Sequence, residues 1–269
     1  MTTPNPFLQN DAWQQLKQGI INLANAEILP RFRQVSAEFK EDGSLLTEAD
    51  TEMQKATQAF LQTHWPQFAF LGEESSEAEQ VAAMASEQGC WILDPVDGTS
   101  NFASGIPVFT VSLALIVKGE LLLGLVYDPS RNEMFAARQG QGAELNDRPL
   151  KAKTAKKTLK QCISLVDFKR LTPELSCKII QQMPYASQRS IGSVALDWCW
   201  IAAGRGQIYC HGAQNIWDYA AGHLILEEAG GYSSTLDKEG VLIAKVEKRS
   251  AVAATTKELF DAWQSFLTD

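Results

Sequence analysis

The sequence predicts a layered α/β fold whose first half is rich in antiparallel strands. Segments with strand character alternate with segments of helical spacing along the chain, and such mixtures pack as sheets and helices around a core. The stretch 109–129 reads as two long apolar strands joined by a tight turn at Lys118 and Gly119, as in an antiparallel hairpin. The 269 residues, 45% of them hydrophobic, suffice for one domain with lobes of about 1–150 and 151–269.

The first half begins with two expected helices. Apolar residues recur at helical spacing over 12–32, and again over 51–65 behind Asp50, with a polar stretch at 40–50 between them. The strands expected after these helices cover 68–76, 90–99, 109–129 (the hairpin) and 133–146. The first two of these strands run into acidic residues.

The second half alternates strands and helices more evenly. The expected strands cover 162–166, 207–211 and 250–255. The expected helices cover 172–183, 193–204, 217–231 and 257–267. The lysine-rich segment 151–160 predicts a solvated loop between the two lobes.

Bulk composition narrows the classes of partner. The net charge of −8 disfavours nucleic-acid binding, and no apolar run approaches the roughly 20 residues of a membrane span. The N-terminus lacks the basic-then-apolar order of a signal peptide. The five cysteines are scattered without a CxxC pair, which disfavours a disulfide framework or a zinc site. We therefore expect a cytoplasmic protein with no nucleic-acid or membrane partner.

The stretch "WILDPVDGTSNF" (91–102) joins a buried-looking strand to two aspartates. Pro95 stiffens the segment between Asp94 and Asp97, and Gly98 permits a sharp turn after it. Two carboxylates held close together repel each other unless a proton or a cation lies between them. Oxygen-only ligands suit hard cations such as Mg²⁺. Seen alone, however, the same aspartates would equally serve to close a turn or cap a helix.

More acids follow other apolar elements. Glu73 and Glu74 come directly after the strand "FAFLG", and Asp218 lies just inside the helix that begins at Trp217. An acid in the first turn of a helix also balances the helix dipole, which is the structural alternative for Asp218. The sequence shows no GxSxG nucleophile motif and no GxxxxGK[ST] phosphate loop.

Four motifs in this order resemble the inositol monophosphatase family. They are "LLTEAD" (45–50), "GEES" (72–75), "DPVDGTSNF" (94–102) and "WDYAAGHLILEEAGG" (217–231). The resemblance implies a layered αβαβα sandwich and a magnesium-dependent, often lithium-sensitive phosphatase with two or three Mg²⁺ ions per site. Members of the family are commonly homodimers, so the resemblance also implies that state.

The resemblance assigns roles residue by residue. The metal ligands it implies are Glu73, Asp94, Val96 (through its carbonyl), Asp97 and Asp218. Asp50 and Thr99 match the pair that positions the attacking water, and Glu74 matches an acid near the first metal. The implied contacts to substrate are Asp97, Gly98, Thr99, Ser100, Gly192, Ser193, Val194, His211 and Asp218.

Substrate choice is where the sequence departs from the family pattern. His211 occupies the position, seven before Asp218, that is typically a glutamate binding an inositol hydroxyl. An imidazole brings no fixed negative charge, which favours a second anionic group on the substrate or a different polyol. The alternative is that His211 only caps a strand. Arg189 and Arg205 are candidates to meet a second phosphate, and either is equally explained as a surface charge.

The sequence thus predicts a phosphoric monoester hydrolase for small polyol or sugar-like phosphates, with inositol 1-phosphate first. The alternatives within enzymes are a 3′-phosphoadenosine 5′-phosphate phosphatase and a histidinol phosphatase. The alternative from another class is a non-catalytic metal-binding interaction protein with the same fold. Trp198 and Trp200 are read as core or subunit contacts rather than as a stacking platform.

Overall fold

The computed structural model describes residues 6–32, 38–39, 45–152 and 158–268. Part of the polar stretch (40–44) and the middle of the lysine-rich segment (153–157) lie outside the described residues, so the loop between the lobes stays a prediction there.

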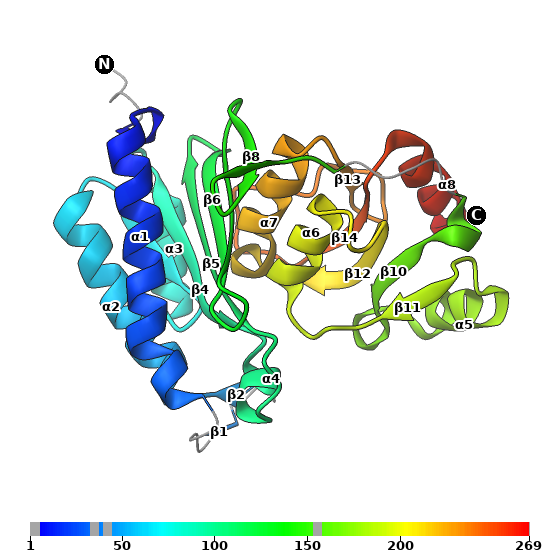
Figure 1. Ribbon diagram of the computed structural model, residues 1–269, viewed down its shortest axis with the longest axis horizontal. Helices are drawn as coiled ribbons and strands as arrows, with labels where there is room; N and C mark the ends of the chain where they lie inside the picture. The colour runs from blue at the N-terminus through cyan, green and yellow to red at the C-terminus, as the bar shows by residue number, and fades with distance from the viewer. Residues whose placement is uncertain (1–5, 33–37, 40–44, 153–157, 269) are drawn as a thin grey trace.

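The chain forms five layers in the order helices, sheet, helices, sheet, helices (Figure 1). Helices α1 and α2 cover the outer face of the first sheet, α6 and α7 lie between the two sheets, and α5 and α8 cover the second sheet. This arrangement confirms the predicted αβαβα sandwich. The helices that set the layers are α1 (Asn10–Glu27), α2 (Glu48–His64), α5 (Pro173–Gln182), α6 (Val194–Ala202), α7 (Ile216–Glu228) and α8 (Lys257–Thr268).

The first sheet holds seven strands in sequence order. They are β3 (Ala69–Gly72), β4 (Cys90–Asp97), β5 (Thr110–Val117), β6 (Glu120–Asp128), β7 (Glu133–Arg138), β8 (Gly142–Leu145) and β9 (Arg148–Leu150). Only the β3–β4 pair is parallel. The hairpin expected over 109–129 is confirmed as β5 and β6.

The central strands β4, β5 and β6 are largely apolar on both faces because helices cover both. In β4, Trp91 and Leu93 join the core under α1 and α2, whereas Ile92 joins the core toward α7. Gly124 in β6 lets α7 pack closely, since a Cβ there would lie 2.7 Å from the carbonyl oxygen of Ala221. A sheet covered in this way reads as continuous apolar runs, as the sequence does.

The second sheet mixes parallel and antiparallel pairs in the order β11-β10-β12-β14-β13. Its strands are β10 (Ile163–Asp167), β11 (Ser187–Arg189), β12 (Ile208–Gln214), β13 (Tyr232–Ser234) and β14 (Arg249–Ala254). β10 runs parallel to β12 and places Asp167 opposite His211. The carboxyl end of β10 therefore lies beside the middle of β12, which brings an acid and an imidazole together.

Several boundaries differ from the sequence expectations. Helix α2 begins at Glu48 rather than behind Asp50, because Thr47 and Asp50 form a capping box around its first turn. Helix α3 (Glu77–Met84) was not expected, although Ser76 and Glu79 cap it in the same way. The short strands β11 and β13 were also not expected. No helix among the described residues is long and apolar enough to span a bilayer.

Candidate active site

The two aspartates of "DPVD" lie within strand β4 rather than in a turn. Asp94 pairs with Ser112 and Asp97 pairs with Thr110, with a shift of register between the two pairs. Between these two pairs β4 advances by three residues and β5 by two, as at a β-bulge. Pro95, which has no N–H to give to a ladder, lies in this irregular segment. The structure therefore corrects the predicted turn to a bulged strand end.

The turn itself comes at Gly98, which has a φ of 98°. A side chain there would be strained, and its Cβ would lie 2.9 Å from the carbonyl oxygen of Val108. Helix α4 (Thr99–Ala103) begins directly afterwards. The N–H groups of its first residues have no acceptor within the helix, so they are available to an anion.

A cleft of about 550 Å³ opens where these elements meet α6, α7 and the second sheet. Most of the residues predicted to form the site line it: Glu73, Asp94, Val96, Asp97, Gly98, Thr99, Ser100, Gly192, Ser193, Val194, His211 and Asp218. They come from segments up to 145 positions apart in the chain, between Glu73 and Asp218. The fold thus brings the predicted acids and the predicted substrate contacts to one place.

Four carboxylates, Glu73, Asp94, Asp97 and Asp218, form what we call the acidic floor of the cleft. Asp94 is only 3% exposed, and burial raises its pKa well above the usual range. The charges of Glu73, Asp97 and Asp218 raise the same pKa further. Burial likewise raises the pKa of Asp218, with contributions from Asp97 and Glu73.

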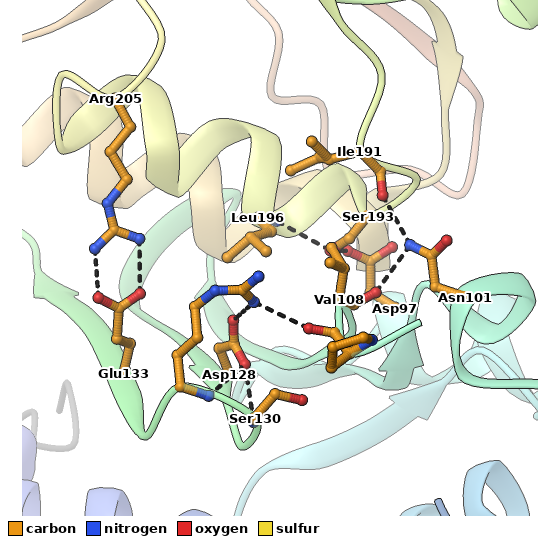
Figure 2. A network of polar contacts seen from close by, with 12 residues as sticks. Asp97, Asn101, Val108, Asp128, Ser130, Glu133, Ile191, Ser193, Leu196 and Arg205 are labelled. Carbon is orange, nitrogen blue, oxygen red and sulfur yellow. Dashed lines mark hydrogen bonds and ion pairs between the residues drawn. The ribbon is translucent and has the colours of Figure 1, made fainter. Parts of the chain in front are cut away.

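Asp97 ties the end of β4 to the start of α6 (Figure 2). Its Oδ2 accepts hydrogen bonds from Ser193 Oγ at 2.5 Å and from the Ala195 N–H at 2.7 Å, and its Oδ1 accepts from the Val194 N–H at 3.2 Å. Burial raises the pKa of Asp97 in spite of these bonds. A carboxylate at the N-terminus of a helix is favourable, so Asp97 also has a structural role.

The other two aspartates of the floor are held by backbone donors. Asp94 Oδ1 accepts from the Val96 N–H at 3.0 Å. Asp218 Oδ2 accepts from the Asn215 N–H at 2.8 Å, in the capping box that starts α7. Asp218 therefore does cap α7, as the structural alternative predicts, and the cap also fixes its carboxylate at the edge of the cleft.

The floor has the donor chemistry of a site for a hard cation. Within the described ranges, no Lys or Arg forms an ion pair with Asp94, Asp97 or Asp218. Buried like charges of this kind require protons or a cation, and oxygen donors suit Mg²⁺. The described residues contain no cluster of three His, Cys, Asp or Glu side chains already arranged as a tight metal cage. The residues thus fit magnesium by their chemistry and burial.

Thr99 and Asp50 form the expected pair at the edge of the floor. Thr99 Oγ1 lies 3.3 Å from Asp50 Oδ1 and 3.0 Å from the Val96 carbonyl oxygen, and it is the donor to either. Asp50 is fully buried and accepts from the Thr47 N–H at 2.9 Å. Asp50 does not line the cleft, and its hydrogen bond with Thr99 links it to a residue that does.

Glu74 lies outside the cleft. It lines a neighbouring shallow depression with Gln54 and Gln58, and its N–H donates to Gln54 Oε1 at 3.1 Å. Its place in the structure gives no support to the predicted catalytic role.

His211 lines the cleft and is 2% exposed. Its Nδ1 accepts the Ala213 N–H at 3.2 Å, which leaves the proton on Nε2, 3.4 Å from Asp167 Oδ2. Both ring nitrogens are thus engaged by the protein. His211 thus lines the cleft while both of its ring nitrogens contact the protein, so its predicted role in substrate binding stays a prediction beside the structural alternative.

Sequence reasoning missed other residues of the cleft. Asn101 Nδ2 donates to the carbonyl oxygens of Ile191 at 2.7 Å and Val108 at 2.9 Å, which joins α4 to the loop before α6 (Figure 2). Asp197, 6% exposed, also lines the cleft, and burial raises its pKa well above the usual range. The acid–base run "DFKR" at the end of a predicted strand was the available signal for three more, Asp167, Lys169 and Arg170.

Comparisons with known proteins give the class. The family model described as the inositol monophosphatase family matches residues 10–265, so the chain belongs to this family. Membership supports a magnesium-dependent phosphatase.

Individual relatives cover most of the chain. Nus factor SuhB of Pasteurella multocida (strain Pm70) is 34% identical over 237 residues, 86% of each chain. Inositol monophosphatase 1 of Solanum lycopersicum is 36% identical over 225 residues, 81% of each chain. A solved structure described as IMPase/NADP phosphatase complexed with Mg²⁺ and phosphate has a TM-score of 0.81 at 25% identity, and the match covers 97% of this chain and 96% of that one.

Proposed function

We propose that this protein is a magnesium-dependent phosphomonoesterase for small polyol or sugar-like phosphates, with inositol 1-phosphate as the first candidate substrate. The observation that carries the proposal is the convergence of the acidic floor and the Thr99–Asp50 pair on one cleft. A non-catalytic scaffold has no need to bury like charges beside a hydroxyl held in that way.

The residues that would hold the metal are Glu73, Asp94, Asp97 and Asp218, with the carbonyl of Val96. Two or three Mg²⁺ ions would stabilise charge on the phosphoryl and leaving oxygens, in a reaction that is among the slowest when uncatalysed. Lithium sensitivity is part of the proposal, since it follows from the family resemblance.

The chain's own groups orient the reaction. Thr99 Oγ1 accepts a hydrogen bond from the attacking water while donating its own hydrogen to Asp50, so that the water is aimed at phosphorus. The N–H groups of Gly98, Thr99 and Ser100 hold the phosphate oxygens. The ester P–O bond breaks as the bond from water to phosphorus forms, and the leaving oxygen gains a proton, giving an alcohol and inorganic phosphate.

The names of relatives favour a phosphatase and differ in the substrate that they mention. The tomato relative is named for inositol monophosphate and the solved neighbour for NADP as well. The P. multocida relative is named as a factor, which keeps a non-catalytic interaction protein as the second candidate. A 3′-phosphonucleotide and histidinol phosphate remain the alternative substrates.

Two further properties belong to the proposal. A cytoplasmic location is supported by the five cysteines, none of which forms a disulfide among the described residues and four of which are buried. A homodimer is supported by the family resemblance.

Trp198 and Trp200 were predicted to make core or subunit contacts. Trp198 is fully buried in the core. Trp200 is partly buried, and Arg131 and Arg205 lie within 6 Å of its ring.

The test is phosphate release from inositol 1-phosphate, histidinol phosphate, fructose 1,6-bisphosphate and 3′-phosphoadenosine 5′-phosphate. Each is assayed with magnesium, with a chelator, and with magnesium restored after chelation. We expect release that depends on magnesium and favours a sugar-like phosphate. Failure to release phosphate from any of the four under all conditions would instead support the interaction protein.

A further inference from the structure

Three basic side chains line the same cleft as the acidic floor. Lys169 and Arg170 lie in the short helix η4 (Phe168–Arg170) that follows β10, and Lys248 immediately precedes β14. All three are exposed, and we call them the cationic rim. Within the ranges that the structure describes, their side chains make no hydrogen bond or ion pair.

This lack of partners distinguishes the three rim cations from Arg189 and Arg205. Arg205 forms a bidentate ion pair with Glu133 (Figure 2), and the Arg189 guanidinium donates to Ser187 Oγ and to the Gln188 carbonyl oxygen. Neither Arg189 nor Arg205 lines the cleft. The two arginines that the sequence offered for a second phosphate are thus replaced by cations from other segments.

Two acids outside the floor, Asp167 and Asp197, line the cleft, and among the described residues neither forms an ion pair with the rim. Asp167 accepts the Lys169 N–H at 3.0 Å and lies 3.4 Å from His211 Nε2. The other acid on this side, Asp197, is buried in the first turn of α6, where loss of hydration favours its neutral form. The four acids of the floor also line the cleft, so the rim cations lie beside an acidic region that is assigned to the metal, and His211 stands where the family pattern has a glutamate.

The backbone fixes where Arg170 lies. Gly212 in β12 packs so closely on η4 that a Cβ would lie 1.7 Å from the Arg170 carbonyl oxygen. This close packing fixes the backbone of η4 beside β12, at the wall of the cleft that both segments line.

We propose that the cationic rim binds a second phosphate group, so that a sugar phosphate carrying two phosphates is hydrolysed more efficiently than the corresponding monophosphates. The scissile phosphate would lie over the acidic floor, and the second would meet Arg170 and Lys248. Cations that line one cleft focus their field on it, and bonds from charged donors to phosphate are among the strong ones. This inference rests on the proposed phosphatase function and adds its substrate class.

The test compares matched substrates: fructose 1,6-bisphosphate against fructose 1-phosphate and fructose 6-phosphate, with magnesium present. We expect kcat/KM for the bisphosphate to exceed that for either monophosphate by about tenfold or more, the scale of one good charged contact. Arg170→Ala and Lys248→Ala should each lower this ratio by about three- to tenfold, chiefly by raising KM for the bisphosphate. Added salt should also lower the ratio, because the rim is exposed.

Lys245→Ala is the matched control. Lys245 is an exposed lysine three positions before Lys248, it pairs with Glu247 at 3.9 Å, and it does not line the cleft. Its removal should leave the ratio unchanged.

The outcomes separate this inference from the function on which it rests. Two results would contradict the proposed role of the rim and still support the phosphatase function. One is magnesium-dependent hydrolysis with no preference for the bisphosphate. The other is a preference that is unchanged in the double variant Arg170→Ala/Lys248→Ala. Absence of magnesium-dependent hydrolysis of all three compounds overturns both.

Discussion

The acidic floor and the cationic rim of the cleft are built in opposite ways. The floor acids come from the ends of β3 and β4 and the first turn of α7; Asp94, Asp97 and Asp218 accept backbone N–H groups, and the first two are almost fully buried. The rim cations come from a short helix and a loop and are exposed. The acids assigned to the metal thus lie on packed elements, whereas the rim cations are exposed side chains on connecting segments, which can be substituted without disturbing the core.

The largest expected effect comes from breaking the floor at Asp94. Asp94→Asn should lower kcat more than about a hundredfold, because even the outer partners of metal ligands cost 10–100-fold when lost. The fold should survive, since the amide relieves repulsion among buried carboxylates. Steady-state kinetics and circular dichroism check both parts. Asp237→Asn, at an exposed acid, is the control, and wild-type turnover in Asp94→Asn would remove the metal assignment.

A slightly smaller effect is expected at the Thr99 hydroxyl, at the edge of the floor. Thr99→Ala should lower kcat by roughly a hundredfold, the scale of a lost general-base contact, with little change in KM. Thr99→Ser keeps the hydroxyl and should retain most of the activity. A change confined to KM would show that Thr99 binds substrate without orienting the water.

The floor was largely predictable from the sequence and the rim was not. Asp94 and Asp97 stand in one continuous motif, and Glu73 and Asp218 directly follow or begin apolar elements, so local pattern identified them. Lys248 lies 78 positions after Arg170, and only the packing of β14 beside β12 brings both to one cleft. No local sequence pattern predicts that residues so far apart in the chain line the same cleft.

The same reason explains the elements that were missed. Strand β11 is three polar or charged residues at a sheet edge, and its pairing with β10 is fixed by tertiary contacts rather than by hydrophobic alternation. The bulge in β4 depends on pairing with β5, so the sequence suggested a turn there. Helix α3 did carry a local signal, its capping box, which the expected strand over 68–76 obscured.

A substitution at His211, which lines the cleft with both regions, tests whether this wall also affects substrate choice. His211→Glu places a carboxylate beside Asp167, so it should weaken binding of a second phosphate. We expect the preference for fructose 1,6-bisphosphate over inositol 1-phosphate to fall by about tenfold, equivalent to about 1.4 kcal/mol. The ratio of kcat/KM values measures this, and His211→Gln is the neutral control. An unchanged ratio in His211→Glu would separate this wall of the cleft from substrate choice.

The smallest expected effect is on stability. The pKa values of Asp94, Asp97 and Asp218 are raised in the folded state, so the folded protein binds more protons than the unfolded one above about pH 4. With chelator present, the free energy of unfolding should therefore fall as pH rises from 5 to 8, and magnesium should reduce that fall. A difference of about 1 kcal/mol corresponds to roughly 2–4 °C in melting temperature.

Thermal melts at these two pH values, with chelator and with magnesium, check the effect. In Asp94→Asn the dependence on pH under chelation should be weaker than in the wild type. The same slope in both proteins would mean that the floor carries no excess charge.

The most direct test of the central claim is calorimetric titration of Mg²⁺ into chelator-treated wild-type protein and into Asp94→Asn, both with inorganic phosphate present. The claim that the acidic floor holds the catalytic metal predicts saturable binding to the wild type that is lost or greatly weakened in Asp94→Asn. Identical isotherms for the two proteins would contradict it, because magnesium would then bind elsewhere or not at all.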